Sequence, residues 1–205
     1  MTDKIPDPRG LHVLAYSQAG HFTARQATGY GFSRQLLAHH VESGRYERIR
    51  RGIYRLARYP GSSYQDVWVN WLAIGTGRAV VSHETALSIH DLSDVVPNAV
   101  HLLVARNDRG IKPPPGVKLH TTRALPSSRD VMVVEGLRVT TPARSIVDAA
   151  IAGTQPDQIA MAVGQALDRG VATGTELRDR ASRISGGGGV WPLLSNSIKE
   201  GPIAV

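Results

Sequence analysis

The stretch that decides the fold is AGHFTARQATGYGFSRQLLAHHVESGRYERIRRGIYRLARYPG, residues 19–61. Thr23 precedes ARQAT and Ser33 precedes RQLLAHHVES, and side chains of this kind accept a hydrogen bond from the first turn of a helix. The run GYG between the two segments permits a tight turn, and Gly44 ends the second segment. This stretch therefore predicts a helix, a turn and a second helix.

The second predicted helix has two different faces. Helical spacing gathers its apolar side chains on one side and leaves the polar ones mostly on the other. The first group is Leu36, Leu37, His40 and Val41, and the second is Arg34, Gln35, Ala38 and His39. Residues 10–19 before it carry apolar side chains at spacings of three and four, which predicts a supporting helix.

Residues 46–56 predict a β-hairpin closed by a two-residue turn at Arg51-Gly52. A regular register places Arg50 opposite Ile53, Ile49 opposite Tyr54, Arg48 opposite Arg55 and Glu47 opposite Leu56. Strand alternation then puts Ile49, Tyr54 and Leu56 on one face and Arg48, Arg50 and Arg55 on the other. Helix, turn, helix and basic hairpin together have the layout of a winged helix-turn-helix.

The charge of the chain is concentrated in the same stretch. The 205 residues carry a net charge of +7, and residues 21–60 hold eight arginines against Glu42 and Glu47, a net charge of +6. Residues 61–205 hold fourteen lysines and arginines against thirteen acidic residues. A localised basic block on a nearly neutral body is typical of a surface that binds a polyanion.

The candidate DNA-contacting residues come from the second helix and the hairpin. Arg34 and Gln35, at the start of that helix, are long enough to reach base edges in a major groove. The arginines placed to neutralise phosphates are Arg25, Arg48, Arg50, Arg51 and Arg55. The alternative is a solvated basic face on an ordinary three-helix domain, but two arginines opposite each other in a hairpin cost stability unless an anion lies across them.

Composition limits the compartment and the chemistry. The chain is 41% hydrophobic and 20% charged, as expected of a folded protein, and it has no cysteine, which excludes disulfides and thiolate metal sites. We see neither a signal peptide nor an apolar run of about eighteen residues. We therefore expect a cytoplasmic protein without a membrane partner.

Beyond residue 60 the pattern is mixed. Residues 59–63 are rich in turn formers and predict a boundary. Helices are predicted over 64–74 and 83–92 and from residue 142 onward, and strands over 99–105, 117–122, 131–134 and 137–141. We expect an α+β protein with a winged helix-turn-helix over residues 1–60 and a mixed α/β C-terminal domain, helical toward its end, over 61–205.

No catalytic, cofactor or metal site is predicted. His39 and His40 are adjacent and would point about a hundred degrees apart on a helix, so they cannot share a metal. We assign His83 and Glu84 to a surface helix, and a metal site formed by these two with His90 and Asp91 is the less favoured alternative. The glycine-rich segments 75–77 and 186–189 lack the context of a phosphate loop and are predicted to be hinges or linkers.

Several separated motifs resemble the AbiEi family of bacterial antitoxins. The helix start at Gly31, Ser33 and Arg34 and the later run Arg51, Gly52, Ile53 and Tyr54 have the family's form. The segments SHETALSIHDL, VHLLVA and VEGLRVTTPARSIVDAA are similar to its central domain. The resemblance spans roughly residues 10–152.

The resemblance implies an antitoxin of a type IV toxin–antitoxin system. Its winged helix would bind repeats in the promoter of its own operon and repress it, and its C-terminal antitoxin domain would neutralise a nucleotidyltransferase toxin. DNA contacts carry over to Ser33 and Arg34 and to the basic hairpin around Arg50 and Arg51. We expect a protein that is not an enzyme and needs no cofactor. The alternatives are an atypical kinase-like enzyme that phosphorylates the toxin and a plain transcription factor without a toxin partner.

Overall fold

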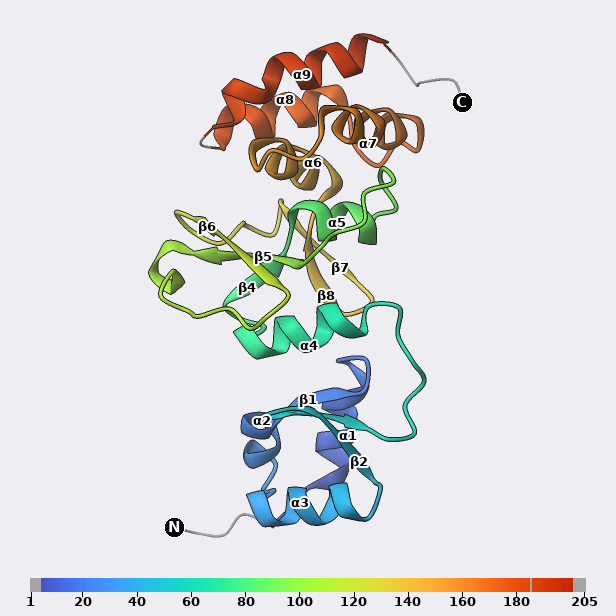
Figure 1. Ribbon diagram of the computed structural model, residues 1–205, viewed down its shortest axis with the longest axis vertical. Coiled ribbons are helices and arrows are strands. Elements are labelled where there is room, and N and C mark those ends of the chain that lie inside the picture. The colour runs from blue at the N-terminus through green and yellow to red at the C-terminus, as the bar shows by residue number, and fades with distance from the viewer. Residues whose placement is uncertain (1–4, 185, 201–205) are drawn as a thin grey trace. The chain divides into compact units, whose positions relative to one another are not determined.

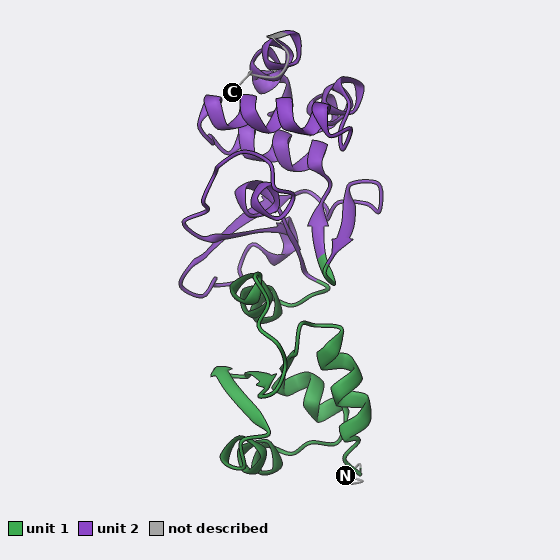
Figure 2. Cartoon of the chain, turned by 90° about the vertical axis from the view of Figure 1, so that its right-hand side faces the viewer, with its two compact units in different colours: residues 1–77, 135–137 green, residues 78–134, 138–205 purple. Residues whose placement is uncertain are grey.

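The computed structural model describes residues 5–184 and 186–200. The contacts within the chain divide it into two units (Figure 2). Unit 1 comprises the residues through Gly77 together with Glu135–Leu137, and unit 2 comprises Arg78–Val134 and the residues from Arg138 on. Helices and strands occur in both units, so the chain has the predicted α+β fold.

Unit 1 contains a helix-turn-helix and a small sheet (Figure 1). Its elements are α1 (Pro8–Tyr16), β1 (His21–Thr23), α2 (Ala24–Gly29), α3 (Arg34–Glu42), β2 (Tyr46–Arg50), β3 (Ile53–Leu56) and α4 (Gln65–Ile74). The hairpin of β2 and β3 is called the wing below. The order of elements through β3 is that of a winged helix-turn-helix, which confirms the predicted fold of this part of the chain.

The sheet of unit 1 has three strands in the order β1-β3-β2, all antiparallel. β1 pairs with β3 through His21↔Arg55, Phe22↔Tyr54 and Thr23↔Ile53. The sequence did not predict this strand, because three residues are too short to show an alternating pattern. The hydrogen bonds to β3 hold β1 in an extended conformation, and α2 follows β1 directly.

The core of unit 1 lies between the helices and one face of the sheet. Side chains from α1, α2, α3 and all three strands form it: Leu11, Ala15, Phe22, Ala27, Phe32, Leu37, Tyr46 and Leu56. α1 begins two residues earlier than predicted, because Asp7 caps it: Asp7 Oδ1 accepts from the amide of Gly10 at 2.8 Å, and Pro8 occupies the first helical position.

Unit 2 is built on a five-stranded mixed sheet in the order β6-β5-β4-β8-β7. The strands are β4 (Ala79–Val81), β5 (Val100–Ala105), β6 (Val117–Thr122), β7 (Val131–Val134) and β8 (Leu137–Thr140). Four of them coincide with predicted strands, and the turn at Glu135-Gly136 joins β7 to β8 as expected. The short strand β4 was not predicted, although it pairs with β5 and β8 in the middle of the sheet.

The helices of unit 2 pack on one another around α6, and α5 joins them to the sheet by contacting both α6 and β5 (Figure 1). They are α5 (His83–Ile89), α6 (Pro142–Ile151), α7 (Pro156–Asp168), α8 (Gly174–Arg183) and α9 (Gly187–Glu200), with a single turn of 3-10 helix at Arg106–Asp108. The prediction that residues 186–189 form a hinge or linker is wrong, because α9 begins inside them. A Cβ on Gly187 would collide with the backbone of Ala181, so the missing side chain lets α8 and α9 approach closely.

The predicted division into domains at residue 60 stays a prediction. In the structure α4 belongs to unit 1, so the helix that follows that boundary packs with the N-terminal elements. Among the helices of residues 5–184 and 186–200, none is both long and apolar enough to cross a membrane.

Candidate nucleic-acid interface

The helix-turn-helix is held by side-chain caps at both helix starts. Thr23 Oγ1 accepts from the amide of Gln26, and Gln26 Oε1 accepts from the amide of Thr23, a reciprocal capping box. Gln26 Nε2 also donates to Gln18 Oε1 at 2.7 Å, which ties α2 to the end of α1. Ser33 Oγ caps α3 by accepting from Leu36 at 3.1 Å, as predicted.

α3 shows the two faces that its sequence predicted. Leu37 is buried and Leu36 is half-buried against the core. The other face is exposed from the first turn onward and comprises Ser33, Arg34, Gln35, Ala38 and His39. Gly31, with φ of 83°, makes the turn that aims this helix. The start of α3 therefore presents a guanidinium and an amide to solvent, the groups that bind guanine and adenine edges in a major groove.

The wing has a register that differs from the prediction. β2 and β3 pair through Arg50↔Ile53, Arg48↔Tyr54, Glu47↔Arg55 and Tyr46↔Leu56, so Ile49 is an extra residue in a bulge. The predicted pairs beyond the first were wrong because a regular ladder was assumed. The bulge places Glu47, not Arg48, opposite Arg55, and their side chains form an ion pair at 2.7 Å.

The bulge therefore relieves, within the protein itself, the repulsion expected between Arg48 and Arg55. Arg48 shares a face of the sheet with Tyr54 and Leu56, contrary to the prediction, whereas Arg50 and Arg55 share the other face as predicted. The bulge arises from the way β2 pairs with β3, and no residue pattern in this stretch indicates it.

Helix α4 covers the second face of the wing. Arg50 Nη1 donates to Asn70 Oδ1 at 2.9 Å, and Arg55 Nη1 donates to Gln65 Oε1 at the same distance. Both partners lie on α4, which also packs against β1 and β3. Two of the predicted phosphate-binding arginines are thus already engaged within unit 1.

The other candidate residues remain exposed. Arg25 lies at the start of α2, Arg48 on the edge strand β2, and Arg51 in the turn of the wing. The amide of Ala24 donates to Gly52 O at 2.9 Å, which brings the start of α2 to the wing turn and so places Arg25 near Arg51. Within residues 5–184 and 186–200, none of these three arginines has an ion pair.

Burial keeps two histidines of unit 1 neutral at pH 7. Burial lowers the pKa of His21 in β1, where Arg55 adds a smaller effect in the same direction. Burial also lowers the pKa of His40 at the end of α3, reinforced by Arg45, His39 and His12. The positive potential of this unit at neutral pH therefore comes from its arginines.

Unit 2 brings together three histidines that are far apart in the sequence. The rings of His83 and His120 stack with centroids 3.4 Å apart, and His120 Nε2 lies 3.3 Å from His101 Nδ1. Burial, with the two neighbouring histidines, lowers the pKa of His83 to about 2, and burial with His101 lowers that of His120 to about 4. His83 is 5% exposed, so its predicted place on a surface helix is wrong.

These histidines do not make a metal centre. In the part of the chain that the structure describes, no group of three or more His, Cys, Asp or Glu side chains is placed to hold a metal ion. His101 Nε2 lies 3.8 Å from Glu84 Oε2, and His90 instead bonds the carbonyl oxygen of Thr140 at 2.7 Å. No residue pattern indicated that His83, His101 and His120 would meet, because α5, β5 and β6 bring them together only in the folded unit.

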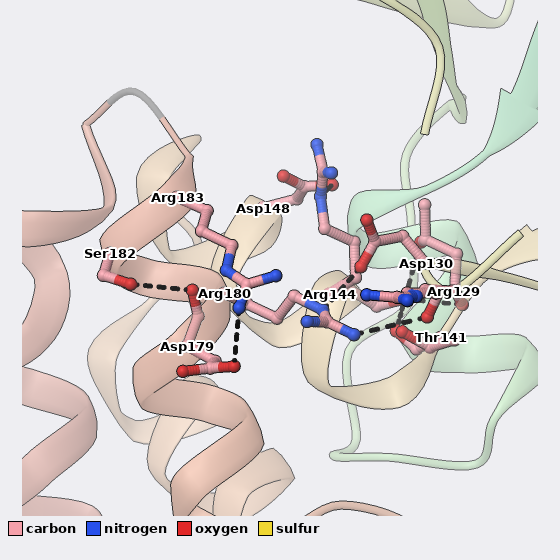
Figure 3. A network of polar contacts seen from close by, with 11 residues as sticks. Arg129, Asp130, Thr141, Arg144, Asp148, Asp179, Arg180, Ser182 and Arg183 are labelled. Carbon is pink, nitrogen blue, oxygen red and sulfur yellow. Dashed lines mark hydrogen bonds and ion pairs between the residues drawn. The ribbon is translucent and has the colours of Figure 1, made fainter. Parts of the chain in front are cut away.

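Arginines of unit 2 pair with aspartates in a network around α6 and α8 (Figure 3). Arg144 Nε donates to Asp148 Oδ2 at 2.8 Å within α6, and both side chains are buried. Arg180 pairs with Asp130, and Arg183 donates to Asp179 at 3.1 Å. Burial raises the pKa of Asp148, and Arg144 opposes that effect. The charges of Arg144, Arg180 and Arg183 are thus each balanced by an aspartate of unit 2.

The comparisons with known proteins agree with the fold of unit 1. Residues 14–57 match a family model described as "Transcriptional regulator, AbiEi antitoxin". The match spans the last turn of α1, the helix-turn-helix and the wing, and it supports a role as an antitoxin and transcriptional regulator. No curated protein matches the sequence.

One solved structure extends the likeness to both units. It is the crystal structure of the RV2827C protein from Mycobacterium tuberculosis, with a TM-score of 0.55 and 14% sequence identity. The alignment covers 96% of this chain and 78% of that one. At this identity the likeness shows the fold alone.

Proposed function

We propose that this chain is an antitoxin of a type IV toxin–antitoxin system that also represses its own operon. On this proposal unit 1 binds repeats in the operator, and the C-terminal domain neutralises a cognate nucleotidyltransferase toxin. One observation carries the DNA-binding half: the exposed start of α3, with Arg34 and Gln35, in the same unit as a wing whose Arg48 and Arg51 stay solvated. The family match over residues 14–57 supports both halves.

The residues divide into three roles on this proposal. Arg34 and Gln35 read base edges, while Ser33 caps the start of α3 and contacts DNA there. Arg25, Arg48 and Arg51 neutralise phosphates. A phosphate contact by Arg50 or Arg55 stays a prediction, and either side chain would have to share the partner that it holds in unit 1.

The DNA-binding half is tested with the chain's own promoter. Binding of a labelled promoter fragment is measured by fluorescence anisotropy at a series of salt concentrations. The logarithm of the affinity should fall linearly with the logarithm of salt, with a slope that drops by about one for each phosphate-binding arginine removed. Salt-independent binding, or equal affinity for the promoter and for random DNA, would reject the assignment.

The antitoxin half is tested with the nucleotidyltransferase encoded beside this gene, if one is present. Co-expression should restore growth to cells that express the toxin alone. Incubating both purified proteins with labelled ATP then separates the alternatives, because phosphate on the toxin under neutralising conditions identifies a kinase-like enzyme. Repression without any rescue of growth identifies a plain transcription factor.

A further inference from the structure

A pocket opens in unit 1 at the base of the wing. Its volume is about 630 Å³, within the range of roughly 300–1,000 Å³ that is common for small-molecule sites. α1, the C-terminal end of α3 and the first and last residues of the wing line it. At about 3.3 Å per residue, the length of β2 separates it from the wing turn by about 15 Å. The pocket therefore lies at the end of the wing opposite to Arg51.

One wall of the pocket is aromatic. Tyr16 and Tyr59 pack edge to face with ring centroids 5.2 Å apart, and both line the cavity with His12. Tyr16 is 62% exposed, so much of its ring is not covered by the protein. An uncovered tyrosine ring beside a cavity is a surface on which a planar ring can stack.

The rim of the pocket is cationic. Arg45 and Arg58 line it, and both are exposed. Neither guanidinium has a side-chain hydrogen bond or an ion pair within residues 5–184 and 186–200, and the lining that the structure describes contains no carboxylate. Two free guanidinium groups at one cavity favour a ligand that carries a phosphate, which arginine binds through two parallel hydrogen bonds.

Polar atoms inside the pocket lack partners. Tyr46 is 4% exposed and lines the cavity, and its hydroxyl has no hydrogen bond to any residue that the structure describes. His40 Nδ1 is buried without a partner, and burial keeps this ring neutral at pH 7. A buried polar atom without a partner costs stability, so a ligand that bonds His40 Nδ1 gains affinity from its position, and the hydroxyl of Tyr46 offers a second polar contact.

We propose that this pocket binds a nucleoside phosphate. The base stacks on Tyr16 and Tyr59, Arg45 and Arg58 hold the phosphate, and Tyr46 and His40 bond polar atoms of the ligand. The aromatic wall, the unpaired guanidinium groups and the unsatisfied polar atoms converge on one cavity, and together they match the parts of a nucleotide. The site is separate from the DNA-contacting residues proposed above, so it can be tested independently of them.

Calorimetric titration of the full chain tests the proposal directly. The probes are the four ribonucleoside monophosphates, the four triphosphates, adenosine and inorganic phosphate. At least one nucleotide should bind, and adenosine and phosphate should each bind about tenfold more weakly or worse, because each lacks one half of the contacts. No binding by any nucleotide, or phosphate binding as tight as that of the best nucleotide, would overturn the proposal.

Four variants test whether the nucleotide binds in this pocket. Arg58→Gln removes one charge from the rim and should weaken binding about tenfold, and Tyr46→Phe removes one hydroxyl and should weaken it about threefold. Arg9→Gln removes an exposed charge from α1 outside this pocket and serves as the matched control. Arg34→Ala removes the proposed base contact and should leave nucleotide binding unchanged.

The same variants also give the results that would contradict the proposed nucleotide site. Equal losses from Arg58→Gln and Arg9→Gln would indicate attraction to the overall charge and reject the site. Loss of nucleotide binding in Arg34→Ala would show that the nucleotide occupies the DNA surface instead. Thermal melting of each variant confirms that it is folded, and Tyr46→Phe keeps the ring that packs against Phe22, so it probes the hydroxyl alone.

Discussion

Arginine serves two different purposes in the two units. Among the described residues, five arginines of unit 2 each pair with an aspartate: Arg78–Asp108, Arg144–Asp148, Arg169–Asp91, Arg180–Asp130 and Arg183–Asp179. In the described part of unit 1 the corresponding set is the single pair Arg55–Glu47. An arginine with its own carboxylate contributes to the fold, whereas an unpaired one leaves positive potential for a partner.

The two units also differ in whether their charged side chains have a partner of opposite charge close by. Residues 61–205 are nearly neutral because their charges cancel, and the pairs show that they cancel locally. Residues 21–60 carry +6 with few acidic residues to cancel it. Substitutions in unit 2 should therefore change stability, and substitutions in unit 1 should change DNA affinity.

The largest effect should follow from breaking the buried pair in α6. Asp148→Ala leaves the guanidinium of Arg144 buried without its partner at 2.8 Å, and we expect a loss of about 3–5 kcal/mol in the free energy of unfolding. Urea denaturation measures it. The matched control is Asp179→Ala, which breaks the exposed pair with Arg183 and should cost less than about 0.5 kcal/mol. Equal losses in the two variants would contradict the importance of burial.

The next effect concerns DNA. Arg34→Ala should lower promoter affinity by about 1–3 kcal/mol and relax sequence preference, and Arg51→Ala should weaken all sequences alike and reduce the salt slope by about one. Neither change should alter the melting temperature, because both side chains are exposed. Arg123→Ala, an exposed arginine of unit 2, is the control and should bind as the original chain does. A similar loss of promoter affinity in Arg123→Ala would show that DNA binding does not depend on unit 1 in particular.

A third effect is the pH dependence of unit 2. The pKa values of His83 and His120 are lowered from 6.5 to about 2 and about 4, so the unfolded chain takes up their protons first as pH falls. Their stabilising effect is complete above about pH 6.5 and decreases below it, by up to about 1.4 kcal/mol per pH unit for a fully buried ring. Melting temperatures at pH 7.5 and 5.5 measure it. His120→Asn should flatten the dependence, and exposed His39→Gln should preserve it.

The smallest effect should come from freeing the paired arginine of the wing. Glu47→Gln removes the carboxylate beside Arg55, and because Glu47 is 44% exposed the cost should be below about 1 kcal/mol. Promoter affinity at low salt should rise slightly, since unit 1 gains one positive charge. A fall in affinity would show that the ion pair matters more for the conformation of the wing than the Glu47 carboxylate does for repulsion of DNA.

Local signals in the sequence predicted the helix-turn-helix well. Thr23 and Ser33 act as caps, and Gly31 has a positive φ, as their positions indicated. The faces of α3 followed from helical spacing. Each of these features depends on residues within one or two turns of one another, where propensity and capping dominate.

Features that depend on distant residues were not predictable in the same way. The bulge at Ile49 depends on the pairing of two strands, and the cover over Arg50 and Arg55 depends on a helix that begins ten residues after Arg55. The glycine run before α9 indicated a linker, whereas Gly187 serves close packing against α8. The sequence thus predicted which face of α3 is exposed, but it predicted the wrong register for the wing, and that register decides which of its arginines are paired.

The bonds from α4 to the wing have an evolutionary consequence. Arg50 with Asn70, and Arg55 with Gln65, are pairs whose members lie on either side of the end of the family match at residue 57. A wing transplanted from a relative without its own α4 would lose both bonds. Among homologues, positions 50 and 70 and positions 55 and 65 should therefore vary together, and recombination between wing and helix should be rarer than recombination after Gly77.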